Sequence, residues 1–378
     1  MNVMLKEIGD IITGNTPSKN SKEFWGSKDI CFIKPDIIAD SRVHEICESN
    51  EYISECARKK ARIVSKDSIF VTCIGSIGKV GIAGEGEYAF NQQINAIVTN
   101  EKVNPRYLAY NLLYNKTRLI DIANAPVVPI INKSQFGEFI ISIEFDINKQ
   151  SRIVAILDKL SSLIEKYNRE IITLDKLVRA RFVEMFNGKN YPREELENLS
   201  HGKGEYGAQS ASVEYNSSRP RYVRITDIKE DGSLNDDFVC SANIEDDELY
   251  KLEYGDFCFA RMGATVGKTY AYRGGNQIFA GYLIRYKLNL NRIIPEYLYE
   301  FTRQHEYRNW ILLNQSGAAQ PGINAKKYGS LRIPVAPLEE QRVFANFVEQ
   351  VNKSKVEVQK ALDKAQLLFD SLMQKYFG

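Results

Sequence analysis

The sequence lacks any apolar stretch of about 18 residues, the length that can cross a membrane, so no transmembrane segment is expected. Its start also lacks the basic-then-apolar order of a secretory signal. Cysteine is sparse, and the six residues show no CxxC pair and no neighbouring histidine cluster. We therefore expect a cytoplasmic protein with free thiols and no metal site.

Signatures of catalysis are missing as well. Residues 263–269 resemble a Walker loop but are one residue short of GxxxxGK[ST], and the similar turn earlier in the chain has Val80 where Ser or Thr is required. His44, His201 and His305 are isolated, with no carboxylate and nucleophile arranged around them. No glycine motif of the kind that holds S-adenosylmethionine follows a predicted strand. The sequence thus predicts neither catalysis nor a cofactor of its own.

An excess of charge of one sign is also absent. The chain has 50 Lys and Arg against 48 Asp and Glu, a formal net charge of +2. This balance neither requires nor excludes a nucleic-acid partner, because binding depends on where the charges lie.

The strongest pattern present is a pair of heptad repeats without internal proline or glycine. Apolar residues at alternating spacings of four and three predict one seam, formed by Ile153, Leu157, Leu160, Ile164, Tyr167, Ile171, Leu174, Val178, Arg181 and Met185. A shift of 191 residues gives the second, formed by Phe344, Val348, Val351, Lys355, Val358, Leu362, Ala365, Phe369, Leu372 and Tyr376. Each pattern predicts a helix of about 35–40 residues, and its apolar stripe needs a partner. Two ordinary amphipathic helices, each packed on its own domain, are the alternative.

The repeat extends beyond these helices. Residues 32–37 resemble 223–228, residues 75–79 resemble 263–268, and residues 104–108 resemble 294–298. The chain is therefore predicted to be two copies of one α+β unit, each a mixed domain followed by a long helix. The expected boundaries are a first domain at 1–145, a helix at 146–187, a linker at 188–195, a second domain at 196–336 and a helix at 337–378.

Short β-branched runs and proline positions predict the elements within each copy. Strands are expected at 67–74, 93–99 and 139–143, and again at 256–262, 280–288 and 331–335. Helices are expected at 105–116 and 295–308, each with proline at its first position. Pro334 predicts an edge strand.

The short linker predicts how the two long helices pair. Parallel helices would require the chain to return roughly 50–60 Å after the first helix, whereas seven to nine residues reach at most about 25–30 Å. Antiparallel packing needs no return. We therefore predict an antiparallel coiled coil that holds two related domains, with a pseudo-twofold relation between the copies.

Two related domains suit a two-part linear target, and duplex DNA is the obvious one. Basic residues cluster at matching places in the two copies, and Arg261 offers a planar fork that could read guanine. The candidate DNA-binding residues are Thr16, Ser18, Lys19, Lys34 and Lys79 in the first copy, and Arg219, Arg221, Arg224, Arg261 and Lys268 in the second. Lys22 and Lys28 also flank the turn at 16–18. Each basic residue alone could be a solvated surface charge, and the acidic segment 230–253 is expected to face away from phosphates.

The order of the motifs, together with the duplication, resembles the specificity subunit of a type I restriction–modification system. The motifs are residues 5–10, 13–18, 75–78 and 90–97, followed by residues 337–342 at the start of the second helix and a degraded form of that opener at 146–152. The resemblance covers the whole chain. The second domain departs from it because residues 196–201 lack the Thr-Pro-Ser turn.

The resemblance implies a subunit without catalysis that binds an asymmetric, bipartite DNA sequence, one half per domain. Its helices would dock two adenine-N6 methyltransferase subunits, which bring S-adenosylmethionine, and up to two ATP- and Mg-dependent restriction subunits could join. Helix length would set the spacing between the half-sites.

The sequence is also compatible with two other classes of protein. A free-standing two-headed DNA-binding regulator would bind tightly without partners, and an unrecognised nuclease or methyltransferase would show turnover alone. Exposed apolar side chains off the seam would favour partner helices; the candidates are Ile156, Leu163, Phe182, Phe186, Phe347, Leu368 and Phe377.

Overall fold

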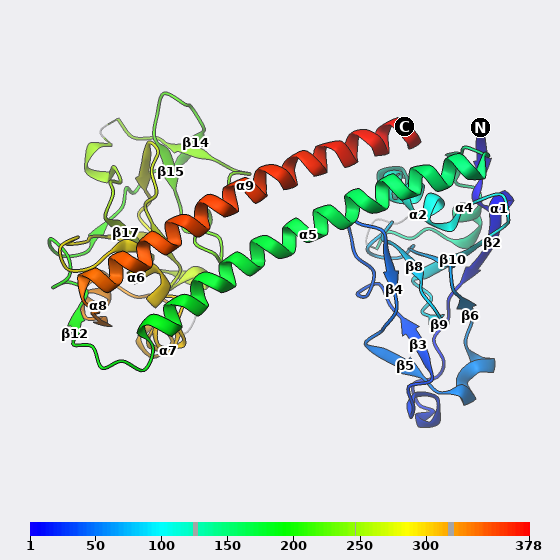
Figure 1. The fold of residues 1–378 in the computed structure, drawn as a ribbon, viewed down its shortest axis with the longest axis horizontal. Coiled ribbons are helices and arrows are strands. Elements are labelled where there is room, and N and C mark those ends of the chain that lie inside the picture. Colours follow the sequence, from blue (N-terminus) through cyan, green and yellow to red (C-terminus); the bar gives the residue numbers. More distant parts are fainter. Residues whose placement is uncertain (124–127, 246, 317–320) are drawn as a thin grey trace. The chain divides into compact units, whose positions relative to one another are not determined.

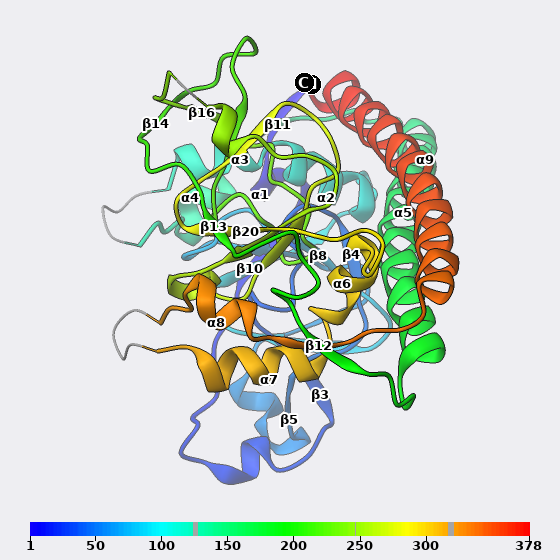
Figure 2. The ribbon, with the colours of Figure 1, turned by 90° about the vertical axis from the view of Figure 1, so that its left-hand side faces the viewer.

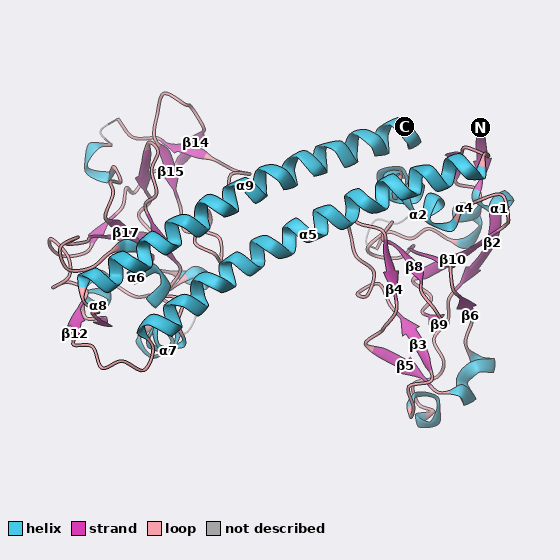
Figure 3. Cartoon of the chain, in the orientation of Figure 1, coloured by secondary structure: helices cyan, strands magenta, loops and turns pink. Residues whose placement is uncertain are grey.

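The computed structural model describes residues 1–123, 128–245, 247–316 and 321–378. The chain divides into two compact units, Met1–Arg169 with Gln359–Gly378 (unit 1) and Glu170–Val358 (unit 2). No helix in these ranges is both long enough and apolar enough to cross a membrane. Figure 3 shows short strands and helices mixed in both units.

Unit 1 contains two mixed sheets and a strand pair. The larger sheet has the order β2 (Gly9–Thr13), β10 (Ile94–Thr99), β7 (Ile69–Thr72), β8 (Val80–Ala83) and β4 (His44–Ile46). The second has the order β5 (Glu51–Ile53), β3 (Ile30–Ile33), β9 (Glu87–Phe90) and β6 (Ile63–Ser65), and β1 (Asn2–Met4) pairs with β11 (Ile140–Ser142). The short helices are α1 (Leu5–Ile8), α2 (Pro105–Tyr114), α3 (Lys116–Asp121) and α4 (Lys133–Gly137).

Unit 2 repeats this plan with fewer strands in its sheets. Its main sheet has the order β13 (Glu205–Tyr206), β20 (Leu283–Lys287), β17 (Asp256–Ala260) and β18 (Thr269–Ala271). The strand pairs are β12 (Arg193–Glu195) with β21 (Arg332–Pro334), β14 (Ser212–Glu214) with β16 (Cys240–Ala242), and β15 (Arg221–Val223) with β19 (Gln277–Phe279). The short helices are α6 (Pro295–Phe301), α7 (His305–Asn314) and α8 (Ala325–Gly329).

The predicted duplication is confirmed by the sheet order. The order β13-β20-β17-β18 matches β2-β10-β7-β8, and the parallel pair β15–β19 matches the parallel pair β3–β9. In each copy a glycine turn follows the central strand, and Gly78 and Gly267 adopt positive φ angles that favour glycine.

Local differences from the sequence predictions are small. The helix expected at 295–308 is two helices, because α6 ends at Phe301 and α7 begins at His305. The last strand before the second long helix carries Pro334 in a two-stranded sheet, where both strands are edges. Residues 193–195, expected in the linker, form β12.

The long helices α5 (Ile147–Phe186) and α9 (Leu338–Phe377) each contain 40 residues, which corresponds to about 60 Å. In unit 1, Val154 and Leu157 of α5 share a core with Phe369 near the end of α9. In unit 2, Val178 near the end of α5 shares a core with Phe344 near the start of α9. The helices are therefore antiparallel in each unit, as predicted, and both views show them side by side (Figures 1 and 2).

None of the residues in either seam is exposed. The two polar seam positions find specific partners within unit 2. Lys355 Nζ lies 2.6 Å from Asp175 Oδ1 on α5, and the Arg181 guanidinium lies 5.9 Å from the ring centroid of Phe347 on α9. Each seam therefore contains one charged side chain that has a partner on the other helix.

The apolar residues off the seam only partly follow the prediction of exposure. Ile156 and Leu368 are exposed, and Leu163 and Phe347 are half-buried. The prediction is wrong for Phe182, Phe186 and Phe377, which are buried. The reason is that the C-terminal end of each long helix packs on the domain of the other repeat as well as on the other helix. The ring centroids of Phe186 and Tyr297 lie 4.9 Å apart, and those of Phe377 and Tyr107 lie 5.1 Å apart.

A fully buried glutamine joins each long helix to its domain. Gln150 Oε1 accepts a hydrogen bond from Asn104 N at 2.7 Å, and its Nε2 donates to Lys102 O and Glu144 O. Gln341, 191 residues later, repeats the arrangement. It accepts from Ile294 N at 2.9 Å and donates to Arg292 O and Ala336 O. The glutamine shared by the two helix openers therefore fixes the helix start.

Candidate nucleic-acid interface

A basic cleft of about 630 Å³ in unit 1, here called the lysine cleft, brings together three of the lysines near the predicted turn. Lys19 Nζ lies 5.1 Å from the Trp25 ring centroid, and Lys28 Nζ lies 5.4 Å from that of Tyr52. Lys22 lines the same cleft. Ammonium groups beside aromatic faces form a surface suited to phosphates and bases.

One carboxylate offsets part of this charge. Glu51 forms ion pairs with Lys34 and, at 3.4 Å, with Lys19. Burial alone would raise the pKa of Glu51, but the hydrogen bonds and charges of the two lysines outweigh burial and hold that pKa below its ordinary value. Glu51 is therefore ionised at neutral pH, and Lys34 is held in an ion pair with it. Lys22 and Lys28 give the cleft its positive charge.

The predicted turn lies beside this cleft. Thr16 and Ser18 are exposed. Thr16 Oγ1 donates to Gln92 Oε1 at 2.8 Å, and the Ser18 carbonyl accepts a hydrogen bond from the Trp25 indole N–H at 3.2 Å. The turn thus helps to position the indole that lines the lysine cleft.

The two lysines after the glycine turns make equivalent contacts in the two units. Lys79 Nζ donates to Pro35 O, and Lys268 Nζ donates to Ile228 O, both at 3.3 Å. Lys268 also lies 2.8 Å from Glu230. These contacts tie each turn to a neighbouring loop. A phosphate contact by either lysine stays a prediction.

The arginines predicted to cluster in the second domain are mostly paired. Arg221 lies 2.5 Å from Asp236, and the Arg224 fork contacts both carboxylate oxygens of Asp227. Arg219 is exposed.

The acidic segment 230–253 therefore does not simply face away from the basic groups. Glu230 of this segment forms an ion pair with Lys268, and Asp236 forms an ion pair with Arg221. The orientation of this segment relative to phosphates stays a prediction.

Arg261 occupies a separate hollow of about 570 Å³ in unit 2, here called the arginine cleft. It follows β17 directly, and its guanidinium carbon lies 5.0 Å and 5.6 Å from the ring centroids of Tyr206 and Tyr282. The two tyrosines are 43% and 53% exposed. The sequence indicated the arginine but not its aromatic neighbours, because these lie 55 residues before it and 21 after it. Only the abundance of tyrosine suggested rings at the interface.

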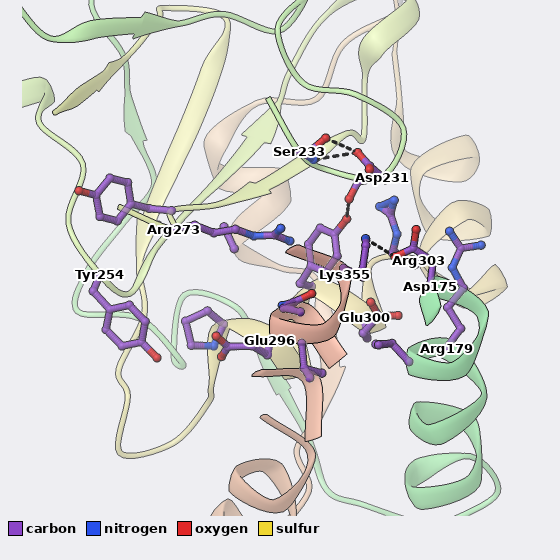
Figure 4. A pocket seen from close by; sticks show the side chains of 17 residues that line it. Asp175, Arg179, Asp231, Ser233, Tyr254, Arg273, Glu296, Glu300, Arg303 and Lys355 are labelled. Atoms are coloured by element: carbon purple, nitrogen blue, oxygen red, sulfur yellow. Dashed lines mark hydrogen bonds and ion pairs between the residues drawn. The ribbon is translucent and has the colours of Figure 1, made fainter. Parts of the chain in front are cut away.

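A third hollow of about 340 Å³ was not predicted (Figure 4). Asp175, Lys355 and Glu300 point toward the same space from α5, α9 and α6 (Figure 4). Burial raises the pKa of Glu300 to about 6 and also raises the pKa of Glu296. One carboxylate oxygen of each is buried without a hydrogen-bond partner among the described residues. Carboxylates of this kind do not suit a DNA surface, so we separate this hollow from the two basic clefts.

Comparison with known proteins identifies relatives for both halves. A family model described as "Type I restriction modification DNA specificity domain" matches residues 1–175 and 195–367. The MjaIX specificity subunit of Methanocaldococcus jannaschii is 31% identical over 187 residues, 48% of this chain and 42% of that protein. The HindI specificity subunit of Haemophilus influenzae is 30% identical over 187 residues, 47% of this chain and 40% of that protein. The matches thus span about two fifths of the length of these relatives.

A solved structure has the same fold. The S subunit of a type I restriction–modification system from M. genitalium aligns over 100% of this chain and 96% of its own, with a TM-score of 0.62 and 15% identity. The sheet order, the duplicated domains and the antiparallel helices described above agree with that likeness. Since the family model covers most of both repeats, the chain belongs to the family of type I restriction–modification DNA specificity proteins.

Proposed function

We propose that this chain is the DNA-recognition subunit of a type I restriction–modification complex and binds an asymmetric, bipartite sequence with one domain per half-site. The observation that supports this most directly is the duplication: two domains of one topology, each followed by a helix that pairs antiparallel with its counterpart. Because the two domains differ in the side chains of their clefts, they would read different half-sequences.

The long helices are the proposed docking surface for two adenine-N6 methyltransferase subunits. Both helices expose large apolar side chains, which solvated helices seldom do in number. In unit 1 these are Ile147, Ile156, Leu367 and Leu368, and in unit 2 they are Ile172, Leu177, Val183, Val343 and Val356. In this proposal S-adenosylmethionine binds the methyltransferase subunits, and ATP and Mg bind up to two restriction subunits. The complex acts on cytoplasmic DNA, and the specificity subunit itself contributes no chemistry.

Methylation mapping tests this proposal. The chain would be co-expressed with its modification subunits, and adenine methylation would be mapped genome-wide with and without the gene for this chain. We expect one asymmetric, bipartite motif that depends on the chain. A map that does not change when the gene is removed would contradict the proposal, as would methylation or cleavage by the purified chain alone.

A further inference from the structure

The Arg261 side chain is held in one orientation before any ligand binds. Its Nε donates to Gly281 O at 3.0 Å, and its guanidinium carbon lies 5.0 Å and 5.6 Å from the ring centroids of Tyr206 and Tyr282. Its backbone N–H donates to Tyr282 O at 3.0 Å, and its carbonyl accepts from Ile323 N at 2.9 Å. Little side-chain entropy is therefore left to lose when this guanidinium binds a ligand.

These anchors leave the outer fork of Arg261 available. They use only the Nε–H, so the four N–H donors on the two Nη atoms have no acceptor among the described residues. The Arg224 fork, in the same cleft, is occupied by Asp227. The described residues that line the cleft include no carboxylate. A ligand with two coplanar acceptors is the complement of the Arg261 fork.

The major-groove edge of guanine has this form. Its O6 and N7 accept two parallel hydrogen bonds, and arginine bound in this way is the commonest specific contact in protein–DNA complexes. A phosphate also offers two acceptors, but a phosphate contact needs no fixed plane, and lysine serves equally as a point charge. Gln209 and Ser210 line the same cleft and add polar groups for neighbouring base edges.

We propose that Arg261 reads a guanine in the half-site that the second domain contacts. This inference rests on the proposed function and names one base of the sequence that it requires. Tyr206 and Tyr282 are positioning residues, because they hold the guanidinium plane and leave both Nη groups free.

The first domain cannot make this contact in the same place. By the repeat, the position of Arg261 corresponds to Cys73, which is buried and whose Sγ lies 3.3 Å from Asn95 Nδ2. Burial raises the pKa of the Cys73 thiol to about 12, so it carries no charge at neutral pH. Changes at Arg261 should therefore affect one half-site only.

Base analogues in the complex with the modification subunits test the proposal. After the methylated motif is mapped, duplexes would carry 7-deazaguanine, which lacks N7, at each guanine of the second domain's half-site in turn. We expect one position at which the wild-type complex loses affinity, with guanine preferred over other bases by roughly 5- to 150-fold. Arg261→Ala should lose a similar factor and become insensitive to the analogue at that position. Arg261→Lys should keep the charge but not the discrimination.

Two controls separate this role from a structural one. Arg332→Lys changes an exposed arginine on β21 and should leave binding unchanged. Tyr282→Ala should weaken guanine discrimination partially, and thermal melting would show that all variants are folded.

Three results would overturn the assignment. The first is a second half-site with only A·T pairs, and the second is unchanged binding by Arg261→Ala. The third is a loss of affinity by Arg261→Ala that is equal for all sequences and comes with a smaller salt slope, because that pattern indicates a phosphate contact. If the wild-type complex yields no bipartite motif at all, the proposed function itself fails. A bipartite motif with an inert Arg261 would refute only this inference.

Discussion

At the scale of single residues, the two buried glutamines are the repeated feature with the clearest energetic consequence. Gln341→Ala would leave Ile294 N–H and the carbonyls of Arg292 and Ala336 without their partner in a buried site. We expect a loss of roughly 2–4 kcal/mol in the free energy of unfolding, measured by chemical denaturation. Gln350→Ala, at an exposed position on the same helix, should change that free energy by less than about 0.5 kcal/mol. Equal effects would mean that Gln341 does not anchor the helix.

The buried Glu300 carboxyl should make the stability of unit 2 depend on pH. Burial raises its pKa to about 6 from an ordinary 4.5. The charges of Arg303, Arg179 and Arg273 lower it, and that of Asp175 raises it, by smaller amounts. The folded state therefore holds this proton more tightly than the unfolded state. Its contribution to stability is fully present below about pH 4.5 and is lost as the pH rises through about 6. The loss corresponds to about 2 kcal/mol.

Glu300→Gln isolates this contribution. Because the amide cannot ionise, we expect the variant to be more stable than the wild type at pH 8 by up to about 2 kcal/mol and nearly equal to it at pH 4.5. Glu339→Gln, at an exposed position, should show no such difference. Denaturation curves across this pH range would measure both, and parallel stability profiles for wild type and Glu300→Gln would contradict the assignment.

At the scale of the elements, neighbouring residues of α9 should separate folding from docking. Phe369 is 8% exposed and its ring centroid lies 6.2 Å from that of Tyr110, whereas Leu367 is 73% exposed. Phe369→Ala should cost roughly 3–5 kcal/mol of stability. Leu367→Lys should leave the melting temperature unchanged and weaken binding of the modification subunit, measured by titration calorimetry. Unchanged binding would remove this part of α9 from the docking surface.

The same elements show what could be predicted from the sequence. The seam was predictable because a heptad repeat records which side chains face the partner helix. The burial of Phe182, Phe186 and Phe377 was not, because one helix that packs on both a helix and a domain buries a second face that the heptad does not mark. The break between Phe301 and His305 has no proline or glycine to signal it.

The candidate site was also only partly predictable from the sequence. The basic residues were visible in the sequence, but their ion pairs with Asp227, Glu230 and Asp236 were not. Arg261 could be recognised as a fork, whereas the tyrosines that orient it come from β13 and from the turn before β20. Contacts between residues distant in the chain depend on the fold and therefore need coordinates.

At the scale of the whole molecule, each domain joins its long helix through contacts that another family member could reproduce. The first domain is closed by the pair β1–β11, and the Gln150 side chain hydrogen-bonds to the main chain of Lys102, Asn104 and Glu144. The remaining requirements are an apolar surface for Val154, Leu157 and Phe369 and polar partners for two carboxylates of α5. In this chain Asp158 contacts Arg106 and Tyr110, and Glu165 contacts Arg42. A domain from a relative that supplies this surface and these polar partners should therefore fold on the unchanged helices.

Exchange of residues 1–145 for the corresponding domain of another specificity subunit should change one half of the methylated motif and leave the other half intact, because the second domain keeps its own sheet, cleft and core. The reciprocal exchange of residues 196–336 should alter the opposite half. Methylation maps of the two chimaeras, each expressed with the same modification subunits, measure this directly. If either exchange altered both halves, the two domains would not read DNA independently, and the equivalence of the two repeats would be one of architecture alone.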